Sequence, residues 1–187
     1  MERPHIVCVS ETWYSESSIP CISGYTLYRK DRTGRGGGVC IYVREDHCSM
    51  EVTCRVLCAD DVEQIWCGVR SGAESLLVGC MYRPPRSNGF VTECVNDSLK
   101  EARKMIENKI YDAVVVCGDS NFPEISWTCD GGIASGEKEM RFLEGLDESF
   151  IIQCVDFPTF IYGKNGDSSL LDLLFTSEPE RVLEVNV

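Results

Sequence analysis

The distribution of apolar residues along the chain predicts many short strands and two helices. Apolar side chains recur at three- and four-residue spacing, the pattern of an amphipathic helix, in residues 89–109 and 137–146. Short apolar or alternating segments, which are typical of strands, occur at residues 6–9, 25–29, 39–43, 50–57, 63–69, 75–82, 113–117, 151–155 and 170–175. Many strands with two intervening helices predict an α/β sandwich.

The strand predicted at residues 113–117 leads directly into a polar turn, within the sequence AVVVCGDSN. Its continuous apolar residues are typical of a strand buried on both faces, and Gly118 ends it. Asp119 and Asn121 follow, and residues two apart in an extended chain point the same way. A carboxylate there suits Mg²⁺, and an amide suits a phosphate oxygen or a water. The alternative is an Asp/Asn turn that satisfies its own backbone.

Further polar side chains stand at or near the ends of predicted strands. Glu11 follows residues 6–9, where it either contributes to a site or caps the next turn, and Tyr82 precedes two prolines. Asp172 lies in the apolar sequence LLDLLF, where a carboxylate is costly to bury unless it is paired, hydrogen-bonded or binds something. The polar residues expected to gather at one end of the sandwich are Glu11, Tyr82, Asp119, Asn121, Thr159 and Asp172.

The loop DRTGRGGG at residues 31–38 is rich in glycine and basic residues. It lacks the GxxxxGK[ST] pattern of a P-loop, and it is interpreted as a hairpin turn whose glycines let the next strand pack closely. The chain's basic residues cluster around it, at Arg29, Lys30, Arg32, Arg35 and Arg44. This cluster is interpreted either as a phosphate-facing patch or as a solvated loop.

The composition indicates one globular domain of 187 residues, with 43% hydrophobic and 26% charged residues. No apolar stretch approaches the roughly 18 residues of a membrane helix, and the first residues lack a secretory signal. The net charge of −12 argues against simple coating of nucleic acid, which needs a basic surface. It does not exclude an enzyme that meets phosphates through a metal ion.

The twelve cysteines are interpreted as small hydrophobic residues rather than as a disulfide framework. Six lie inside apolar runs, namely Cys8, Cys40, Cys67, Cys80, Cys117 and Cys154. The sequence contains no CxxC pair, which argues against a structural zinc site. Without a secretory signal, a reducing intracellular compartment, either nuclear or cytoplasmic, is expected.

Six motifs in order resemble the endonuclease/exonuclease/phosphatase superfamily, and within it the apurinic-type endonuclease domain of non-LTR (LINE-type) retrotransposons. They are VCVSETW, GGGVCIYV, MYRPP, VVVCGDSNFPEISW, FPTF and SSLLDLLFTS, and they span almost the whole chain. The resemblance implies a four-layer sandwich of two mixed β-sheets flanked by helices. It also implies Mg²⁺- or Mn²⁺-dependent hydrolysis of a phosphodiester, with DNA as substrate and a reverse transcriptase in the same element.

The resemblance implies a role for each candidate residue. Glu11 would ligate the metal and Tyr82 would touch the phosphate. Asp119 would orient or deprotonate the attacking water, and Asn121 would hold that water and the phosphate. Two further roles are implied: Asp172 would support a catalytic histidine, and Thr159 would line the DNA-facing surface.

The sequence departs from the family pattern in three places. Family members carry an upstream strand with a metal-site asparagine and a downstream Ser-Asp-His motif, and neither is found in residues 1–187. The two histidines, His5 and His47, match neither place, and Ser120 replaces a usually apolar or aromatic residue. The expectation is therefore one incomplete domain, monomeric, whose nicking activity is lost or crippled. The alternatives are a phosphoesterase for small or lipid phosphates and a non-catalytic remnant.

Overall fold

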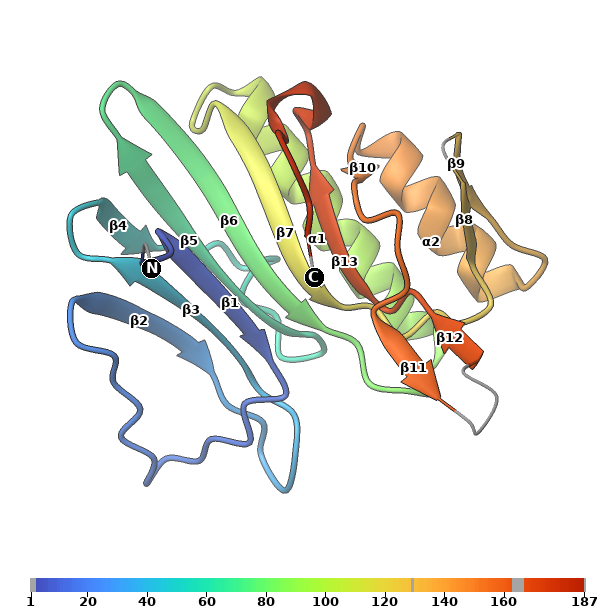
Figure 1. The fold of residues 1–187 in the computed structure, drawn as a ribbon, viewed down its shortest axis with the longest axis horizontal. Helices are drawn as coiled ribbons and strands as arrows, with labels where there is room; N and C mark the ends of the chain where they lie inside the picture. The colour runs from blue at the N-terminus through green and yellow to red at the C-terminus, as the bar shows by residue number, and fades with distance from the viewer. Residues whose placement is uncertain (1–2, 129, 163–166, 187) are drawn as a thin grey trace.

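The computed structural model describes residues 3–128, 130–162 and 167–186, and its central element is a six-stranded sheet in the order β10-β13-β7-β6-β5-β4 (Figure 1). The parallel pairing of β6 with β7 makes this sheet mixed, because its other neighbours pair antiparallel. Its strands are β4 (Cys48–Glu51), β5 (Glu63–Ser71), β6 (Glu74–Tyr82), β7 (Ala113–Asp119), β10 (Ile152–Gln153) and β13 (Asp172–Thr176).

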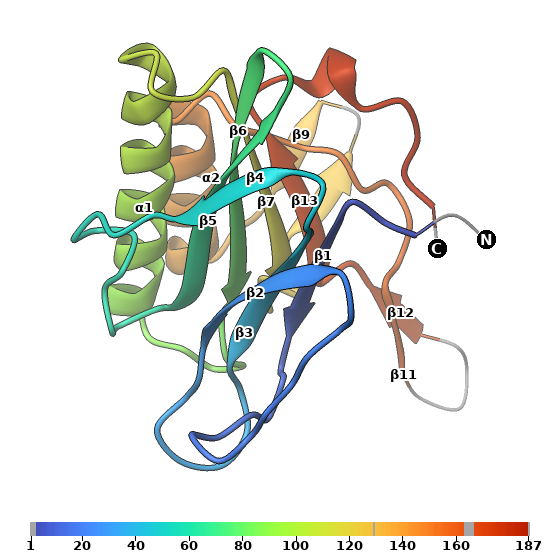
Figure 2. The same ribbon diagram turned by 90° about the vertical axis from the view of Figure 1, so that its left-hand side faces the viewer.

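A three-stranded sheet lies against one face of the six-stranded sheet (Figure 2). It consists of β1 (Ile6–Ser10), β3 (Val39–Arg44) and β2 (Tyr25–Lys30), all antiparallel. Lys30 pairs with Val39, so residues 31–38 form the hairpin loop that the sequence predicted. The interpretation of two mixed sheets is wrong for these strands, since this smaller sheet is antiparallel.

Two helices cover the opposite face of the six-stranded sheet (Figure 2). They are α1 (Gly89–Glu107) and α2 (Glu137–Glu148), close to their predicted ranges. One apolar core, centred on Trp66, Leu99 and Phe142, lies between helices and sheet. A second core, with Val39, Ile65 and Cys80, joins the two sheets. The described residues thus form three layers, and the fourth layer implied by the resemblance stays a prediction.

Short elements complete the chain: the hairpin of β8 (Ser126–Thr128) and β9 (Gly131–Ile133), the pair β11 (Phe160–Tyr162) and β12 (Asp167–Ser169), and a 3₁₀ turn at Pro179–Arg181. The cysteines of the described residues are free thiols, as expected. Within this part of the chain, neither helix is long and apolar enough to cross a membrane.

Two strand predictions were too long. Only the first residues of the range 50–57 belong to β4. Val52 still donates its backbone N–H to the carbonyl oxygen of Trp66 at 2.9 Å, and the chain from there to Leu57 leaves the sheet while Val52 and Leu57 bury their side chains in the helix-side core. In the range 151–155, β10 covers only Ile152 and Gln153, although the backbone N–H of Cys154 also donates to Leu174 of β13 at 2.8 Å. An apolar run therefore located buried chain correctly, but it did not distinguish a strand from a buried loop.

Candidate active site

Neighbouring strands of the six-stranded sheet bring polar residues into one row at an end of the sheet. Tyr82, the last residue of β6, is in register with Asp119, the last residue of β7. Asp119 is in turn directly opposite Asp172, the first residue of β13. On the other side, Tyr82 is opposite Glu63, where β5 begins. The backbone pairing alone therefore places three candidate residues side by side.

Asp119 is held by the turn that follows it. Its Oδ1 accepts the backbone N–H of Asn121 at 3.0 Å, and its Oδ2 accepts the Asn121 side-chain amide at 2.6 Å. The same amide donates to the carbonyl oxygen of Arg83 at 3.0 Å. Asn121 has a φ of 48°, a conformation that asparagine tolerates better than most residues. The Asp/Asn turn that the sequence offered as the alternative is therefore present. Within this turn, the side-chain amide of Asn121 orients the Asp119 carboxylate.

The environment of Asp119 makes it a weaker acid than usual. Burial, followed by the negative charges of Asp172 and Glu11, raises its pKa to about 6, although the Asn121 hydrogen bonds oppose the shift. A carboxyl with a pKa near neutrality is ionised at pH 7 and still a useful proton acceptor. The electrostatics therefore suit Asp119 to general-base chemistry.

Glu11 reaches this row from the three-stranded sheet. It follows β1 with a φ of 53°, and its Oε1 accepts a hydrogen bond of 2.8 Å from the phenol of Tyr82. Burial and the neighbouring Glu11 carboxylate raise the pKa of Tyr82, so the phenol stays protonated and acts as a donor. The site is thus assembled across the interface between the two sheets.

The glycine-rich hairpin loop supports Glu11 and Tyr82. Glu63 accepts the backbone N–H of Gly38 at 2.6 Å and the Nε–H of Arg32 at 2.8 Å. A side chain on Gly37 would overlap Glu63 and Arg32, so the close packing predicted for this loop is confirmed. The guanidinium of Arg32 lies 5.6 Å from the centre of the Tyr82 ring. The loop therefore places one cation beside the candidate site.

The basic cluster around this loop is mostly engaged with acidic partners. Arg29 pairs with Asp31 at 3.4 Å, and Lys30 pairs with Asp60 at 3.0 Å. Arg44 contacts Asp46 at 2.7 Å. The interpretation of these residues as one continuous phosphate-facing patch receives no support from this pairing. Arg32 is itself paired with Glu63, and it is the member that contacts the Tyr82 ring.

Asp172 and Thr159 occupy places that the sequence only partly anticipated. The side chain of Asp172 is exposed rather than embedded among apolar neighbours, because β13 begins at this residue at the open end of the sheet. Thr159 is half-buried, and its hydroxyl oxygen accepts the backbone N–H groups of Leu171 and Asp172 at 3.1 and 3.0 Å. Thr159 therefore fixes the start of β13, and its contact with DNA stays a prediction.

Replacing Thr159 with valine is expected to lower the free energy of unfolding by about 1–3 kcal/mol, because two N–H groups lose their acceptor. Thr159→Ser keeps the hydroxyl and is the matched control. Urea unfolding followed by circular dichroism measures both variants. A loss for serine with none for valine would show that packing of the methyl group, not the hydrogen bonds, matters at this position.

Arg83 is a site-supporting residue that sequence reasoning missed. It is only 3% exposed, and its guanidinium lies 3.9 Å from the centre of the Phe122 ring. It donates to the carbonyl oxygens of Asn121 and Ser87, at 3.0 and 3.2 Å. Burial lowers the pKa of Arg83. The position of Arg83 between a strand and two prolines does not predict its burial, since its partner Asn121 is distant in sequence.

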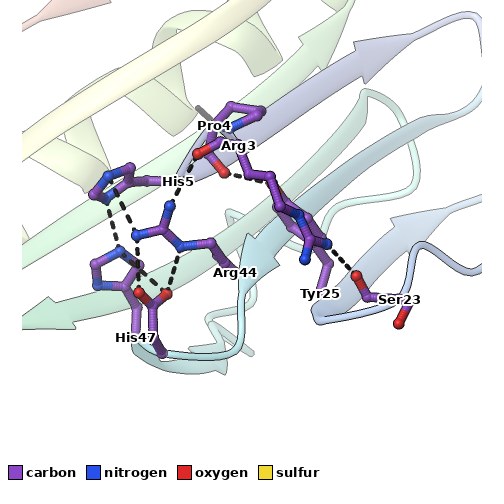
Figure 3. A network of polar contacts seen from close by, with 8 residues as sticks. Arg3, Pro4, His5, Ser23, Tyr25, Arg44 and His47 are labelled. Carbon is purple, nitrogen blue, oxygen red and sulfur yellow. Dashed lines mark hydrogen bonds and ion pairs between the residues drawn. The ribbon is translucent and has the colours of Figure 1, made fainter. Parts of the chain in front are cut away.

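The two histidines lie away from this site, as their sequence positions indicated. Glu11 follows β1, whereas His5 precedes it. His5 lies beside His47, which is in the turn after β3 (Figure 3). The ring nitrogens of the two histidines are 2.8 Å apart, and Arg44 contacts His5 at 3.3 Å. Neither histidine is therefore placed to act at Asp119.

The candidate residues fit a hydrated Mg²⁺ better than a closed metal centre. Glu11, Asp119 and Asp172 offer hard carboxylate oxygens, and a divalent cation would relieve the repulsion that Asp119 experiences from the other two. Within the described residues, no three His, Cys, Asp or Glu side chains are close enough to enclose an ion. Mg²⁺ usually keeps several waters and binds one or two carboxylates, which matches this open arrangement.

Comparison with solved structures identifies the fold. The endonuclease domain of TRAS1, a telomere-specific non-LTR retrotransposon, matches with a TM-score of 0.63 and 16% identity over 93% of this chain and 73% of that domain. The human Nocturnin catalytic domain matches at 0.60 and 13%, over 94% and 70%. The 3′ phosphatase NExo from Neisseria, bound to a product DNA hairpin, matches at 0.63 and 12%, over 93% and 76%. These similarities show the endonuclease/exonuclease/phosphatase fold.

Sequence comparison assigns the family. A search of curated proteins found no significant match. The family model described as endonuclease-reverse transcriptase matches residues 76–186, which is more than half of the chain and includes Tyr82, Asp119 and Asp172. The protein therefore belongs to the endonuclease-reverse transcriptase family.

Proposed function

We propose that this domain hydrolyses phosphodiester bonds of DNA with the help of a divalent metal ion, as a retrotransposon-type nicking endonuclease. The observation that carries the proposal is the row of Tyr82, Asp119 and Asp172 at one sheet end, with Glu11 bonded to Tyr82. Family membership and the likeness to the TRAS1 endonuclease domain support DNA as the substrate class. Reverse transcriptase is the functional partner that the family description implies.

The proposed mechanism assigns one role to each residue. Asp119, with its pKa near 6 and its orientation fixed by Asn121, accepts the proton of the attacking water. Tyr82 donates its hydroxyl hydrogen to Glu11 in the free protein and is placed to donate to a phosphate oxygen when substrate binds. Glu11 and its neighbouring carboxylates would hold Mg²⁺ or Mn²⁺, which would stabilise negative charge on the phosphate and leaving oxygen.

The proposal includes a low rate of DNA nicking by residues 1–187. His5 and His47 lie beyond the far end of β1, so neither supplies a donor to the phosphate or to the leaving oxygen. A donor aimed at developing negative charge is commonly worth about 10²- to 10³-fold in rate. Slow, metal-dependent nicking is therefore the expected behaviour.

Nicking of supercoiled plasmid by residues 1–187 with Mg²⁺ or Mn²⁺ tests the proposal. Slow conversion to open circles that stops with a chelator supports it. Faster release of inorganic phosphate from soluble phosphoinositides would instead support a phosphoesterase for small substrates. Absence of both activities, with intact folding, would contradict the enzymatic proposal and favour a non-catalytic remnant. Gel filtration in the same buffer checks the expected monomer.

A further inference from the structure

Trp13 is a large aromatic side chain that remains exposed beside the candidate active site. It lies two residues after Glu11, in the loop that leaves β1, and 58% of its surface is accessible. Trp66, by contrast, is completely buried in the helix-side core. None of the catalytic roles proposed above uses the Trp13 indole, so its exposure at this location calls for a separate explanation.

The backbone holds Trp13 in this position at an energetic cost. Its φ is 56°, in the left-handed region that bulky residues avoid, and Glu11 has a φ of 53°. The backbone N–H of Trp13 donates to the carbonyl oxygen of Gly37 at 2.9 Å, and that of Thr12 donates to Gly38 at 3.1 Å. The hydrogen bonds that set the course of the chain after Glu11 therefore also fix the backbone from which the Trp13 side chain projects.

The surroundings of the Trp13 ring include two guanidinium groups, of which Arg32 is paired with Glu63, and they are continuous with the candidate site. A point at the Cβ position of Gly36 would lie 3.8 Å from the indole and 4.0 Å from an Arg32 nitrogen. Arg32 itself lies over the Tyr82 ring at 5.6 Å. Arg35 lies 5.7 Å from the centre of the Trp13 ring. An aromatic face, two guanidinium groups and the Tyr82 phenol thus follow one another along one surface.

We propose that Trp13 is a stacking platform for a nucleobase next to the phosphate that is cut. An exposed indole between cations matches a ligand that alternates flat aromatic groups with negative charges, as single-stranded nucleic acid does. A base is available for stacking only when it has left the duplex, so the preferred substrate carries an unpaired or extruded base. This inference rests on the proposed function and narrows its substrate to DNA that is locally single-stranded.

Phe150 provides a matched control within the same chain. It is 67% exposed, has a φ of 51°, and has the guanidinium of Arg103 at 5.2 Å from its ring centre. It follows α2, close to Ile152, whose partner is Thr176 at the end of β13 opposite Asp172. Phe150 therefore has the same local character as Trp13 at the other end of the sheet.

The experiment compares two labelled twelve-residue DNA strands by fluorescence anisotropy, without a divalent metal. One carries thymine at every position and the other is abasic, so their backbone charges are equal. Wild-type protein should bind the thymine strand about 5- to 100-fold more tightly, since stacking contributes this much per base. Trp13→Ala should lose the preference, while Trp13→Phe should keep most of it and Phe150→Ala all of it.

Several results would overturn the inference. Equal affinity of the wild-type protein for both strands would do so, as would a preference that Trp13→Ala retains. A Trp13→Ala variant that changes oligomeric state rather than DNA affinity would indicate a protein contact instead. Thermal unfolding of each variant controls for folding. Because no cleavage is required, the two proposals can fail separately. Base preference without plasmid nicking would leave base stacking on Trp13 standing while the proposed function fails. Nicking without base preference would leave the proposed function standing while the stacking role of Trp13 fails.

Discussion

Asp119→Asn is expected to reduce metal-dependent nicking by about 10²- to 10⁴-fold, the range that general-base catalysis commonly contributes. The amide of asparagine is not basic and cannot accept the proton of the attacking water, although it has nearly the shape of the carboxylate. Asp119 lies at the centre of the candidate site, because Asn121 hydrogen-bonds to both of its carboxylate oxygens and Asp172 lies directly opposite it in the sheet. Initial rates on supercoiled plasmid measure the change.

The control is Asp112→Asn, because Asp112 directly precedes β7 at its opposite end and bonds Ser75 there. Its nicking rate should match that of the wild type. In the wild type, the rate should rise with pH and then level, because only ionised Asp119 accepts a proton. The midpoint should lie below the metal-free pKa of about 6, since a bound divalent cation favours the ionised carboxylate. Since folding raises this pKa from 3.8, the contribution of Asp119 to stability falls as pH increases from 3.8 to about 6. A flat pH profile, or an active Asp119→Asn, would contradict the assignment.

Gly118→Ala is expected to lower the free energy of unfolding by about 3–5 kcal/mol, combining backbone strain with overpacking. Gly118 has a φ of 143°, and a Cβ at this position would overlap the carbonyl oxygen of Met81. Met81 and Gly118 are partners in the parallel pairing of β6 with β7, so neither backbone can move away without breaking the ladder. Urea unfolding followed by circular dichroism gives the difference.

Gly89→Ala is the matched control for this loss. Gly89 is the first residue of α1, and a Cβ there would meet no atom within 4 Å. Alanine at that position should change the free energy of unfolding by less than about 1 kcal/mol, in the stabilising direction. If Gly118→Ala costs no more than Gly89→Ala, the close approach of β7 to Met81 is not a constraint on this fold.

The sequence predicted the parts of the site that depend on local patterns. The apolar run before Gly118 located β7, although the strand continues through Gly118 to Asp119 instead of ending at the glycine. The turn residues singled out Asp119 and Asn121, which are hydrogen-bonded to each other in the structure. Both helices were predicted within a few residues because their apolar positions repeat over several turns. The role of the glycines at residues 34–38 as a tight hairpin also follows from local chemistry.

Features that depend on distant partners were not predictable in the same way. The register between Asp119 and Asp172 is set by pairing of strands more than fifty residues apart, and it leaves Asp172 exposed where its apolar neighbours indicated burial. Arg83 gave no local sign that it would lie under the Asn121 turn. The contact of Glu63 with the glycine-rich loop likewise joins elements that only the folded chain brings together.

Glu11 directly follows β1 of the three-stranded sheet, and Tyr82 is the last residue of β6 in the six-stranded sheet. Their hydrogen bond therefore links the two sheets, which are held together by the apolar core of residues such as Val39, Ile65 and Cys80. The distance between the Glu11 carboxylate and the Tyr82 phenol, the two groups proposed for catalysis, therefore depends on how firmly the apolar side chains of this core hold the two sheets together. Weaker packing in that core would misalign the Glu11 carboxylate and the Tyr82 phenol while the strand pairing within each sheet stays intact. Chemistry in this molecule is therefore expected to fail before secondary structure does.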